Sequence, residues 1–175
     1  YGGHETEKNR ILIVHDFPQE SEEHRFLEKK QQTIVISEKQ PIRPCVGCFG
    51  CWVKTPGECV IRDTYGDMGK LLSRCTELWI ISRCVYGSYS PFIKNVIDRS
   101  ISYNHPDFVI RNDEMHHRRR YLNRFFLKVI FYGEDISTAE RTTAKGLVQA
   151  NALNFDCDAT VAFISDKKKI KEVLA

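Results

Sequence analysis

Five short runs of apolar residues, most of them rich in β-branched side chains, are spaced along the chain between polar segments. The runs are continuous rather than alternating, which is typical of strands that are covered on both faces. The pattern therefore predicts five buried strands, at residues 11–14, 33–36, 78–81, 125–131 and 159–164.

Helical signals lie between these runs. Residues 67–75 carry apolar side chains three and four positions apart, which is the spacing of one helix face. Ser90 before Pro91 is typical of a helix start, and Glu140 is well placed near the positive end of another helix. The predicted helices begin at or near Glu22, Asp67, Ser90, Ser137 and Asp166.

The alternation of strands and helices predicts the fold class. Right-handed crossovers between successive strands give a parallel five-stranded sheet between two helix layers, an α/β three-layer sandwich. The flavodoxin-like strand order 2-1-3-4-5 is the natural candidate. We expect one such domain over residues 1–175, with a cysteine-rich insertion at about residues 39–63.

This fold class also predicts where a ligand binds. In open parallel sheets, ligands bind beyond the carboxyl ends of the strands, near the position where the strand order reverses. The expected site is therefore formed by three loops, at residues 15–20, 83–90 and 132–136.

Composition narrows the class of protein. The 175 residues are 42% hydrophobic and 28% charged, which excludes a disordered chain, and no apolar run approaches the length of a membrane span. The net charge of +3 is too small to require nucleic acid or an anionic membrane as a partner. The polar segment Tyr1–Arg10 does not read as a secretion signal, so we expect a cytoplasmic protein.

Four of the seven cysteines fall in one short segment, with the spacing Cys45-x2-Cys48-x2-Cys51-x7-Cys59. Three thiolates two residues apart can each hold one corner of a [4Fe–4S] cluster, and a fourth can arrive from further along the chain. Structural zinc usually takes two separated pairs of ligands instead. The spacing predicts a metal or redox site, with a cluster, plain thiols, and zinc or a disulfide as the open alternatives.

A basic stretch at residues 111–124 includes His116, His117, Arg118, Arg119 and Arg120. A solvated loop or a subunit contact is the favoured interpretation, because Asp113 and Glu114 interrupt the charge. The alternative is a clamp for a small anionic ligand, such as one that carries phosphate groups. Nucleic-acid binding is disfavoured, because no known binding module surrounds the stretch.

Several segments together resemble one known family. They are Cys45-Val-Gly-Cys-Phe-Gly-Cys-Trp-Val-Lys-Thr-Pro-Gly-Glu-Cys59, then Ile61-Arg-Asp63, Leu78-Trp-Ile-Ile-Ser-Arg-Cys-Val-Tyr-Gly-Ser-Tyr-Ser-Pro-Phe-Ile-Lys-Asn-Val-Ile-Asp-Arg99, Glu114-Met-His-His117, Phe131-Tyr-Gly-Glu134 and Ala150-Asn-Ala-Leu-Asn154. They are similar to segments of the flavodoxin-fold NAD(P)H-dependent FMN reductases and of the related iron–sulfur flavoproteins. The resemblance covers most of the chain from Cys45 onward.

The resemblance implies a non-covalently bound FMN, with NAD(P)H as co-substrate and a small-molecule acceptor or a redox protein as partner. It implies that no side chain needs to act as acid or base. Tyr86 and Tyr89 would stack on the flavin ring or lie along its edge, and backbone N–H groups near Gly87 would meet the polar edge of the ring. The implied flavin-binding residues are Asp16, Phe17, Pro18, Ser21, Arg83, Cys84, Val85, Tyr86, Gly87, Ser88, Tyr89 and Gly133.

The same resemblance places the cysteine segment near these loops, where a cluster held by Cys45, Cys48, Cys51 and Cys59 would relay electrons. A homo-oligomer is expected, because the long connection at residues 105–123 can reach a partner subunit. The alternative function is a non-catalytic electron-transfer or metal-binding module that uses the cysteine segment while the flavin site is degenerate.

Two departures from the family pattern bear on the flavin. Cys84 stands where relatives usually carry a proline, and the first loop is acidic where theirs is rich in hydroxyls. The first loop is expected to receive the FMN phosphate, and hydroxyl donors would help while carboxylates oppose it. Two like unit charges about 4 Å apart repel by about 1 kcal/mol in water and by up to about 4 kcal/mol at an intermediate dielectric constant. If the first loop keeps its acidic side chains at the site, phosphate binding is therefore disfavoured.

Overall fold

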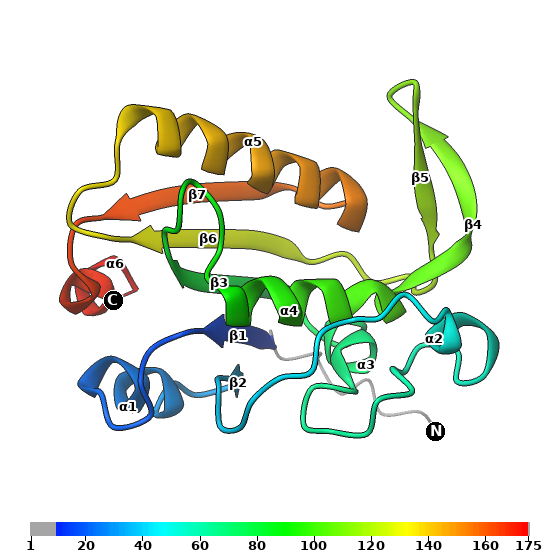
Figure 1. Ribbon diagram of the computed structural model, residues 1–175, viewed down its shortest axis with the longest axis horizontal. Coiled ribbons are helices and arrows are strands. Elements are labelled where there is room, and N and C mark those ends of the chain that lie inside the picture. The colour runs from blue at the N-terminus through cyan, green and yellow to red at the C-terminus, as the bar shows by residue number, and fades with distance from the viewer. Residues whose placement is uncertain (1–9, 175) are drawn as a thin grey trace, which may run out of the picture.

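The computed structural model describes residues 10–174, and the polar segment used above to argue against a secretion signal lies almost wholly outside them. Five strands form one parallel sheet in the order β2-β1-β3-β6-β7 (Figure 1). The strands are β1 (Ile11–His15), β2 (Thr33–Ile36), β3 (Glu77–Arg83), β6 (Phe126–Tyr132) and β7 (Ala159–Ile164). Counted within the sheet this is the order 2-1-3-4-5, so the predicted fold class is confirmed.

Helices cover both faces of the sheet. Side chains of α3 (Met68–Leu72), α4 (Pro91–Arg99) and α5 (Thr138–Phe155) share one buried cluster with one face of the strands. Side chains of α1 (Glu22–Glu28), and of the segment holding α6 (Ile170–Val173), share a second cluster with the other face. No helix within residues 10–174 combines the length and the apolar character that crossing a membrane requires.

Most of the helices start where the sequence predicts. Ser137 caps α5 in a reciprocal arrangement with Glu140, and Ser90 directly precedes α4. The helix expected from Asp166 starts instead as a short 3-10 turn, Lys167–Lys169, followed by the four residues of α6.

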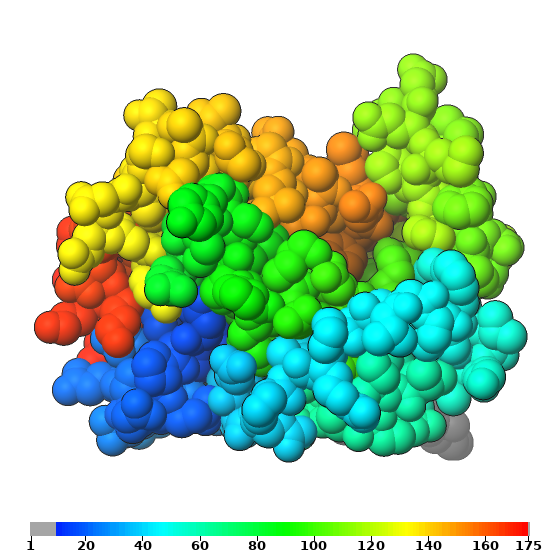
Figure 2. Space-filling view, viewed as in Figure 1, coloured from blue at the N-terminus to red at the C-terminus, as the bar shows by residue number. Residues whose placement is uncertain are grey.

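The connection between α4 and β6 is not the plain loop that the basic stretch suggested. After a 3-10 turn (Ser100–Tyr103), it forms an antiparallel hairpin of β4 (Asn104–Arg111) and β5 (Glu114–Arg119). Asn112 and Asp113 both adopt positive φ angles, of 51° and 62°, which is the conformation of a two-residue hairpin turn. Figure 2 shows this hairpin projecting beyond the body of the molecule.

Candidate functional sites

Three loops leave the sheet at the carboxyl ends of β1, β3 and β6, and Figure 1 shows all three at one end of the molecule. The residues that the family resemblance assigned to a flavin belong to these loops or to the strand ends beside them. Gly133 begins the third loop, and its N–H donates to the Ile164 carbonyl at 3.1 Å. The fold therefore brings together the three segments predicted to bind a flavin.

Asp16 ties the first loop to the two neighbouring strands. Its Oδ2 accepts a hydrogen bond from the Arg83 backbone N–H at 2.9 Å, and its Oδ1 accepts one from the Tyr132 hydroxyl at 2.9 Å. Burial and the Asp16 carboxylate raise the pKa of Tyr132, so its hydroxyl stays protonated and donates at neutral pH. The carboxylate is thus fixed among the ends of β1, β3 and β6.

Behind this carboxylate, buried rings hold the first loop. His15 is fully buried, and its Nδ1 accepts the Phe17 N–H at 3.0 Å. The other ring nitrogen of His15 lies 3.2 Å from His24 Nδ1, so it carries the proton and donates to His24. Burial above all lowers the pKa of His15 to about 3, which keeps the ring neutral. Phe17 is itself only 2% exposed, so its ring belongs to the core.

Several polar groups of the first loop already have partners. The Ser21 hydroxyl caps α1 by accepting the His24 N–H at 3.1 Å, and Glu22 and Glu23 occupy the first turn of that seven-residue helix. Further backbone N–H groups donate to protein acceptors, from Asp16 to Ile81 O, from Phe17 to His15 Nδ1 and from Ser21 to Pro18 O. With the carboxylates of Asp16, Glu22 and Glu23 at or beside the loop, these residues do not fit the phosphate end of FMN, because like charges repel.

The loop after β3 forms a tight turn that leans on α5. Val85 and Ser88 exchange two backbone hydrogen bonds of 2.9 Å. Tyr86, at the tip, has a φ angle of 52° and is 90% exposed. A Cβ on Gly87 would lie 2.8 Å from the Glu140 carbonyl oxygen, so only glycine fits between the turn and the helix. The turn therefore presents the Tyr86 ring to solvent, free to cover a flat ligand.

Tyr89 is placed differently from Tyr86. It is 4% exposed, stacks on Phe131 with 5.3 Å between ring centroids, and donates its hydroxyl to Asn151 at 2.9 Å. Since the ring packs in the core, Tyr86 is the tyrosine of this loop with a free face. Cys84 is half-buried, and burial raises the pKa of its thiol.

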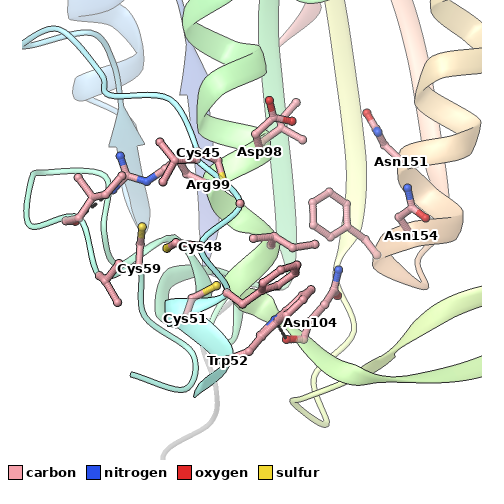
Figure 3. Close-up of a pocket in the computed structure, with 18 residues that line it drawn as sticks. Cys45, Cys48, Cys51, Trp52, Cys59, Asp98, Arg99, Asn104, Asn151 and Asn154 are labelled. Carbon is pink, nitrogen blue, oxygen red and sulfur yellow. Dashed lines mark hydrogen bonds between the residues drawn. The ribbon is translucent and has the colours of Figure 1, made fainter. Parts of the chain in front are cut away.

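A cavity of about 490 Å³ lies between the cysteine segment, the C-terminal ends of α4 and α5, and the start of β4 (Figure 3). Figure 3 shows four cysteines on one side of it and two asparagines of α5 on the other. Burial, followed by the neighbouring thiols, raises the pKa of Cys51, in line with the grouping of the four sulfurs. The polar lining of the two sides is Cys45, Cys48, Cys51 and Cys59 opposite Asn151 and Asn154, with Asn104 between them.

The expectation that the cysteine segment lies near the flavin loops is wrong for a single chain. Figure 1 shows α2 (Gly50–Val53), within this segment, at the opposite end of the sheet from those loops. The reason is its anchorage, since Arg99 at the C-terminal end of α4 binds the segment. Helices in crossovers run antiparallel to the strands, so this helix end lies at the amino ends of the strands.

Arg99 is the anchor of the cysteine segment. Its guanidinium is buried and donates to the Arg43 and Ile61 carbonyls and, through two hydrogen bonds of 2.8 and 2.9 Å, to Asp63. Its Nε is buried with no hydrogen-bond partner among the described residues. Burial would lower the pKa of Arg99, but the Asp63 hydrogen bonds and the nearby Cys59 sulfur raise it. A positive charge with a spare donor thus lies in the cavity wall.

Trp52 joins the cysteine segment to the hairpin. Its Nε1 donates to the Asn104 carbonyl at 3.1 Å, and its ring lies 4.8 Å from that of His117 and 5.5 Å from that of Phe49. Phe49 and Gly47 adopt positive φ angles, of 55° and 64°, which turn the chain sharply between the cysteines. No group of three or more His, Cys, Asp or Glu side chains within residues 10–174 is arranged so that it could hold a metal ion.

The basic stretch does not form a clamp beside the flavin loops, because the hairpin carries it at the cavity end of the sheet (Figure 1). Three of its arginines converge instead on Asp156, from Arg111 at 3.9 Å, Arg119 at 3.2 Å and Arg124 at 3.7 Å. Arg118 pairs with Asp107 at 3.1 Å on the hairpin surface. Much of the positive charge is therefore already matched within the chain.

Sequence reasoning missed Arg99 and the three asparagines of the cavity. Arg99 ends an amphipathic helix, where a basic residue usually lies in solvent and faces the helix dipole. Its acidic partner, Asp63, is 36 positions away. The available signals were the Ile61-Arg-Asp63 segment directly after Cys59, which placed an acid near the cysteines, and the family-like segments that end at Arg99 and at Asn154, which carried these residues without assigning them a role.

No protein-family model and no curated protein sequence matches the chain. Solved structures do match it. An azoreductase from Bacillus anthracis str. Sterne is 11% identical with a TM-score of 0.59, covering 95% of this chain and 93% of that one. An NADPH-quinone reductase from P. pentosaceus is 12% identical with a TM-score of 0.54, covering 94% of each chain.

General stress protein 14 from Treponema denticola, solved in complex with FMN, is 12% identical with a TM-score of 0.52 and covers 88% of this chain and 84% of its own. At such low identities the matches establish a shared fold. They confirm the flavodoxin-like architecture that the order of strands predicted.

Proposed function

We propose that the chain is a flavin-dependent oxidoreductase, which takes reducing equivalents from NAD(P)H and passes them to a small-molecule acceptor or a redox protein. The observation that carries this proposal is the turn after β3, which holds an exposed Tyr86 at the carboxyl end of a sheet shared with an FMN-binding protein and two reductases. Fold alone does not imply function, so the residues of the turn decide the matter.

The chain's own contribution is binding and orientation, while a bound flavin would supply the redox chemistry. In the proposed site, Tyr86 covers the ring and the backbone around Gly87 meets its polar edge. Gly133 leaves room beside the third loop, and no acid or base is required. FMN is the flavin that the resemblance implies, although the first loop does not fit its phosphate.

The test is a titration of the protein with flavins, followed by flavin fluorescence, together with an assay of NAD(P)H oxidation in the presence of a quinone. We expect flavin binding, flavin-dependent oxidation, and at least a severalfold loss of affinity in Tyr86→Ala. Val53→Ala is the matched control, because Val53 is 78% exposed on α2, at the opposite end of the sheet from Tyr86. A protein that binds no flavin, and that oxidises no NAD(P)H when flavin is supplied, contradicts the proposal.

The cavity favours a second function, electron transfer through a [4Fe–4S] cluster on the cysteine segment. Four thiols, the ligand type that such a cluster takes, border one cavity, and a buried guanidinium with an unpaired Nε lies beside Cys59. Within residues 10–174 no three of these side chains are grouped so that they could hold a metal ion, so the segment would have to draw the thiols together around a cluster. Hydrogen bonds to cluster sulfurs are a common means of setting reduction potential. Cys45, Cys48, Cys51 and Cys59 would hold the cluster, and Arg99 would balance its negative charge.

Anaerobic reconstitution with iron and sulfide tests this second function. We expect broad visible absorbance and about four iron atoms per chain, and loss of both in Cys48→Ser. Cys84→Ser removes a half-buried thiol outside the cavity and serves as the control. If the wild-type protein binds no iron, the cluster proposal is wrong while the flavin proposal is untouched.

We assign the expected homo-oligomer contact to the hairpin, where Phe108, Ile110 and Met115 are 61–66% exposed. Sedimentation of the wild-type protein and of Ile110→Glu tests the contact, and an unchanged association state in the variant would argue against it.

We also propose a cytoplasmic location. It agrees with the seven free thiols, since the reducing cytoplasm keeps cysteines unpaired.

A further inference from the structure

The Asp16 carboxylate is an acceptor that is only partly used. An ionised carboxylate offers about four lone-pair sites. The Arg83 N–H and the Tyr132 hydroxyl occupy two of them. The remaining sites can accept hydrogen bonds from the hydroxyl groups of a sugar alcohol, whereas a phosphate dianion has no proton to give them. Asp16 therefore favours a ligand end that carries hydroxyls over one that carries phosphate.

The first loop has little freedom to rearrange around a phosphate. Phe17 is buried and donates to His15, which in turn donates to His24. The Ser21 hydroxyl holds the N-terminus of α1. Turning any of these groups toward a ligand would leave a buried acceptor or a helix end without its partner, which is unfavourable. The fold of this loop therefore holds these groups in place.

Nearby charges do not compensate for Asp16. Glu22 and Glu23, in the first turn of α1, lie 3.1 Å and 3.9 Å from lysines of the C-terminal segment, so those lysines are already paired. The exposed Arg83 side chain lies near Tyr132 and offsets at most the single charge of Asp16. Arg25, which donates to the Glu20 carbonyl, adds one positive charge beside the loop, and Glu20 adds one negative charge. A phosphate monoester carries a charge of about −1.5 to −2 at neutral pH, so it would enter a loop with no excess of positive charge.

From this geometry we infer that the site selects a flavin lacking the terminal phosphate, so that riboflavin binds more tightly than FMN, with Asp16 as the residue that determines this specificity. The inference rests on the proposed flavin-dependent function and narrows its cofactor or substrate to the uncharged flavin class. It also gives a reason for the acidic first loop, which recognises the hydroxyl-bearing side chain of the flavin in place of a phosphate.

The experiment compares riboflavin and FMN as ligands of the wild-type protein, by fluorescence titration at low and at high salt. We expect FMN to bind about tenfold more weakly than riboflavin at low salt, because the repulsion between like charges a few ångströms apart corresponds to about a tenfold change in affinity. Added salt screens this repulsion, so the difference in affinity between the two flavins should become smaller. Equal or tighter binding of FMN overturns the inference and leaves the proposed function standing, whereas binding of neither flavin overturns both.

Substitution of Asp16 assigns the effect to a residue. Asp16→Asn removes the charge and keeps an acceptor for the Tyr132 hydroxyl, so we expect the riboflavin preference to fall towards unity. Asp113→Asn makes the same chemical change at the exposed tip of the hairpin and should leave the ratio unchanged. An unchanged ratio in Asp16→Asn contradicts the role of Asp16. Should that variant not fold, the salt series on the wild-type protein decides the inference by itself.

Discussion

The two ends of the sheet treat their polar groups in opposite ways. At the carboxyl end, the Asp16 carboxylate has two protein donors, and the His15 ring has a hydrogen-bonding partner at each nitrogen. At the amino end, a cavity of about 490 Å³ is bordered by four thiols and by Arg99, whose Nε has no partner within residues 10–174. The protein therefore holds the Asp16 and His15 side chains at one end, whereas at the other end thiols border an open cavity.

This difference shows where each end can bind something. At the amino end the four thiols border the cavity, so a group bound there can contact sulfur directly. At the carboxyl end, a ligand must use what the satisfied network leaves over, which is the exposed Tyr86 ring and the spare lone pairs of Asp16. The carboxyl end of the sheet therefore suits a flat, uncharged ligand. The amino end suits a sulfur-containing group, such as a cluster bound by the thiols.

The largest expected effect comes from breaking the buried ion pair at the amino end. Arg99→Gln leaves the Asp63 carboxylate without its cation and removes the anchor of the cysteine segment. We expect the free energy of unfolding to fall by about 3–5 kcal/mol, as when one partner of a buried pair is removed. Denaturant unfolding monitored by circular dichroism measures it.

Arg62→Gln is the matched control, because Arg62 forms an exposed pair with Glu58, at 3.6 Å, in the same segment. Exposed pairs contribute about 0–1 kcal/mol, so this variant should unfold almost like the wild type. If both variants lose the same stability, Arg99 is not a buried anchor, and the contrast between the two ends of the sheet disappears.

The second-largest expected effect is at the carboxyl end, where the neutral His15 makes the stability of the protein depend on pH. In the unfolded chain this histidine regains a pKa near 6.5, whereas in the folded protein burial lowers its pKa to about 3. Between these values the unfolded state binds more protons, so stability falls as the pH drops from 6.5 towards 3. The slope is at most about 1.4 kcal/mol per pH unit for one such group.

His15→Asn removes this linkage while Asn can still accept the Phe17 N–H. We expect the variant to be less stable than the wild type at pH 7, with the gap shrinking by about 3 kcal/mol at pH 4. Unfolding curves at the two pH values measure the gap directly. A gap of constant size would mean that His15 is protonated in the folded protein.

The strands could be predicted from the sequence because each is covered on both faces, which concentrates β-branched and apolar residues in a continuous run. Residues 159–164 match β7 at both ends for this reason. The hairpin was not predicted from the sequence, because it lies outside the sheet with Phe108 and Ile110 exposed and no buried face imposes a pattern on its sequence. Its turn, Asn112-Asp113, was the local signal available.

The functional residues divide in the same way. The grouping of four cysteines follows from their spacing along the chain, and the structure places all four at one cavity. The role of Arg99 depends on a partner 36 residues away, and the position of the cavity depends on the direction of α4, so neither could be read from local sequence. Long-range contacts decide which end of the sheet a segment reaches.

The smallest expected effect is the difference in stability between two glycine-to-alanine substitutions, one at each end of the sheet. Gly87 and Gly47 share a left-handed backbone, with φ angles of 77° and 64°, so alanine at either position costs about 1 kcal/mol in backbone strain. A Cβ on Gly47 meets nothing within 4 Å, whereas one on Gly87 lies 2.8 Å from both the Glu140 carbonyl oxygen and Thr143. Gly87→Ala should therefore lose about 2 kcal/mol in denaturant unfolding, against about 1 kcal/mol for Gly47→Ala.

The difference between these two variants isolates packing, because the backbone term is common to both. Gly87→Ala should also weaken flavin binding, since pushing the turn off α5 moves the Tyr86 ring, while Gly47→Ala leaves that loop untouched. Equal losses of stability would mean that the turn after β3 can shift freely. A mobile turn of that kind would not hold a ring in place, and the argument for a binding site at the carboxyl end would lose its rigid element.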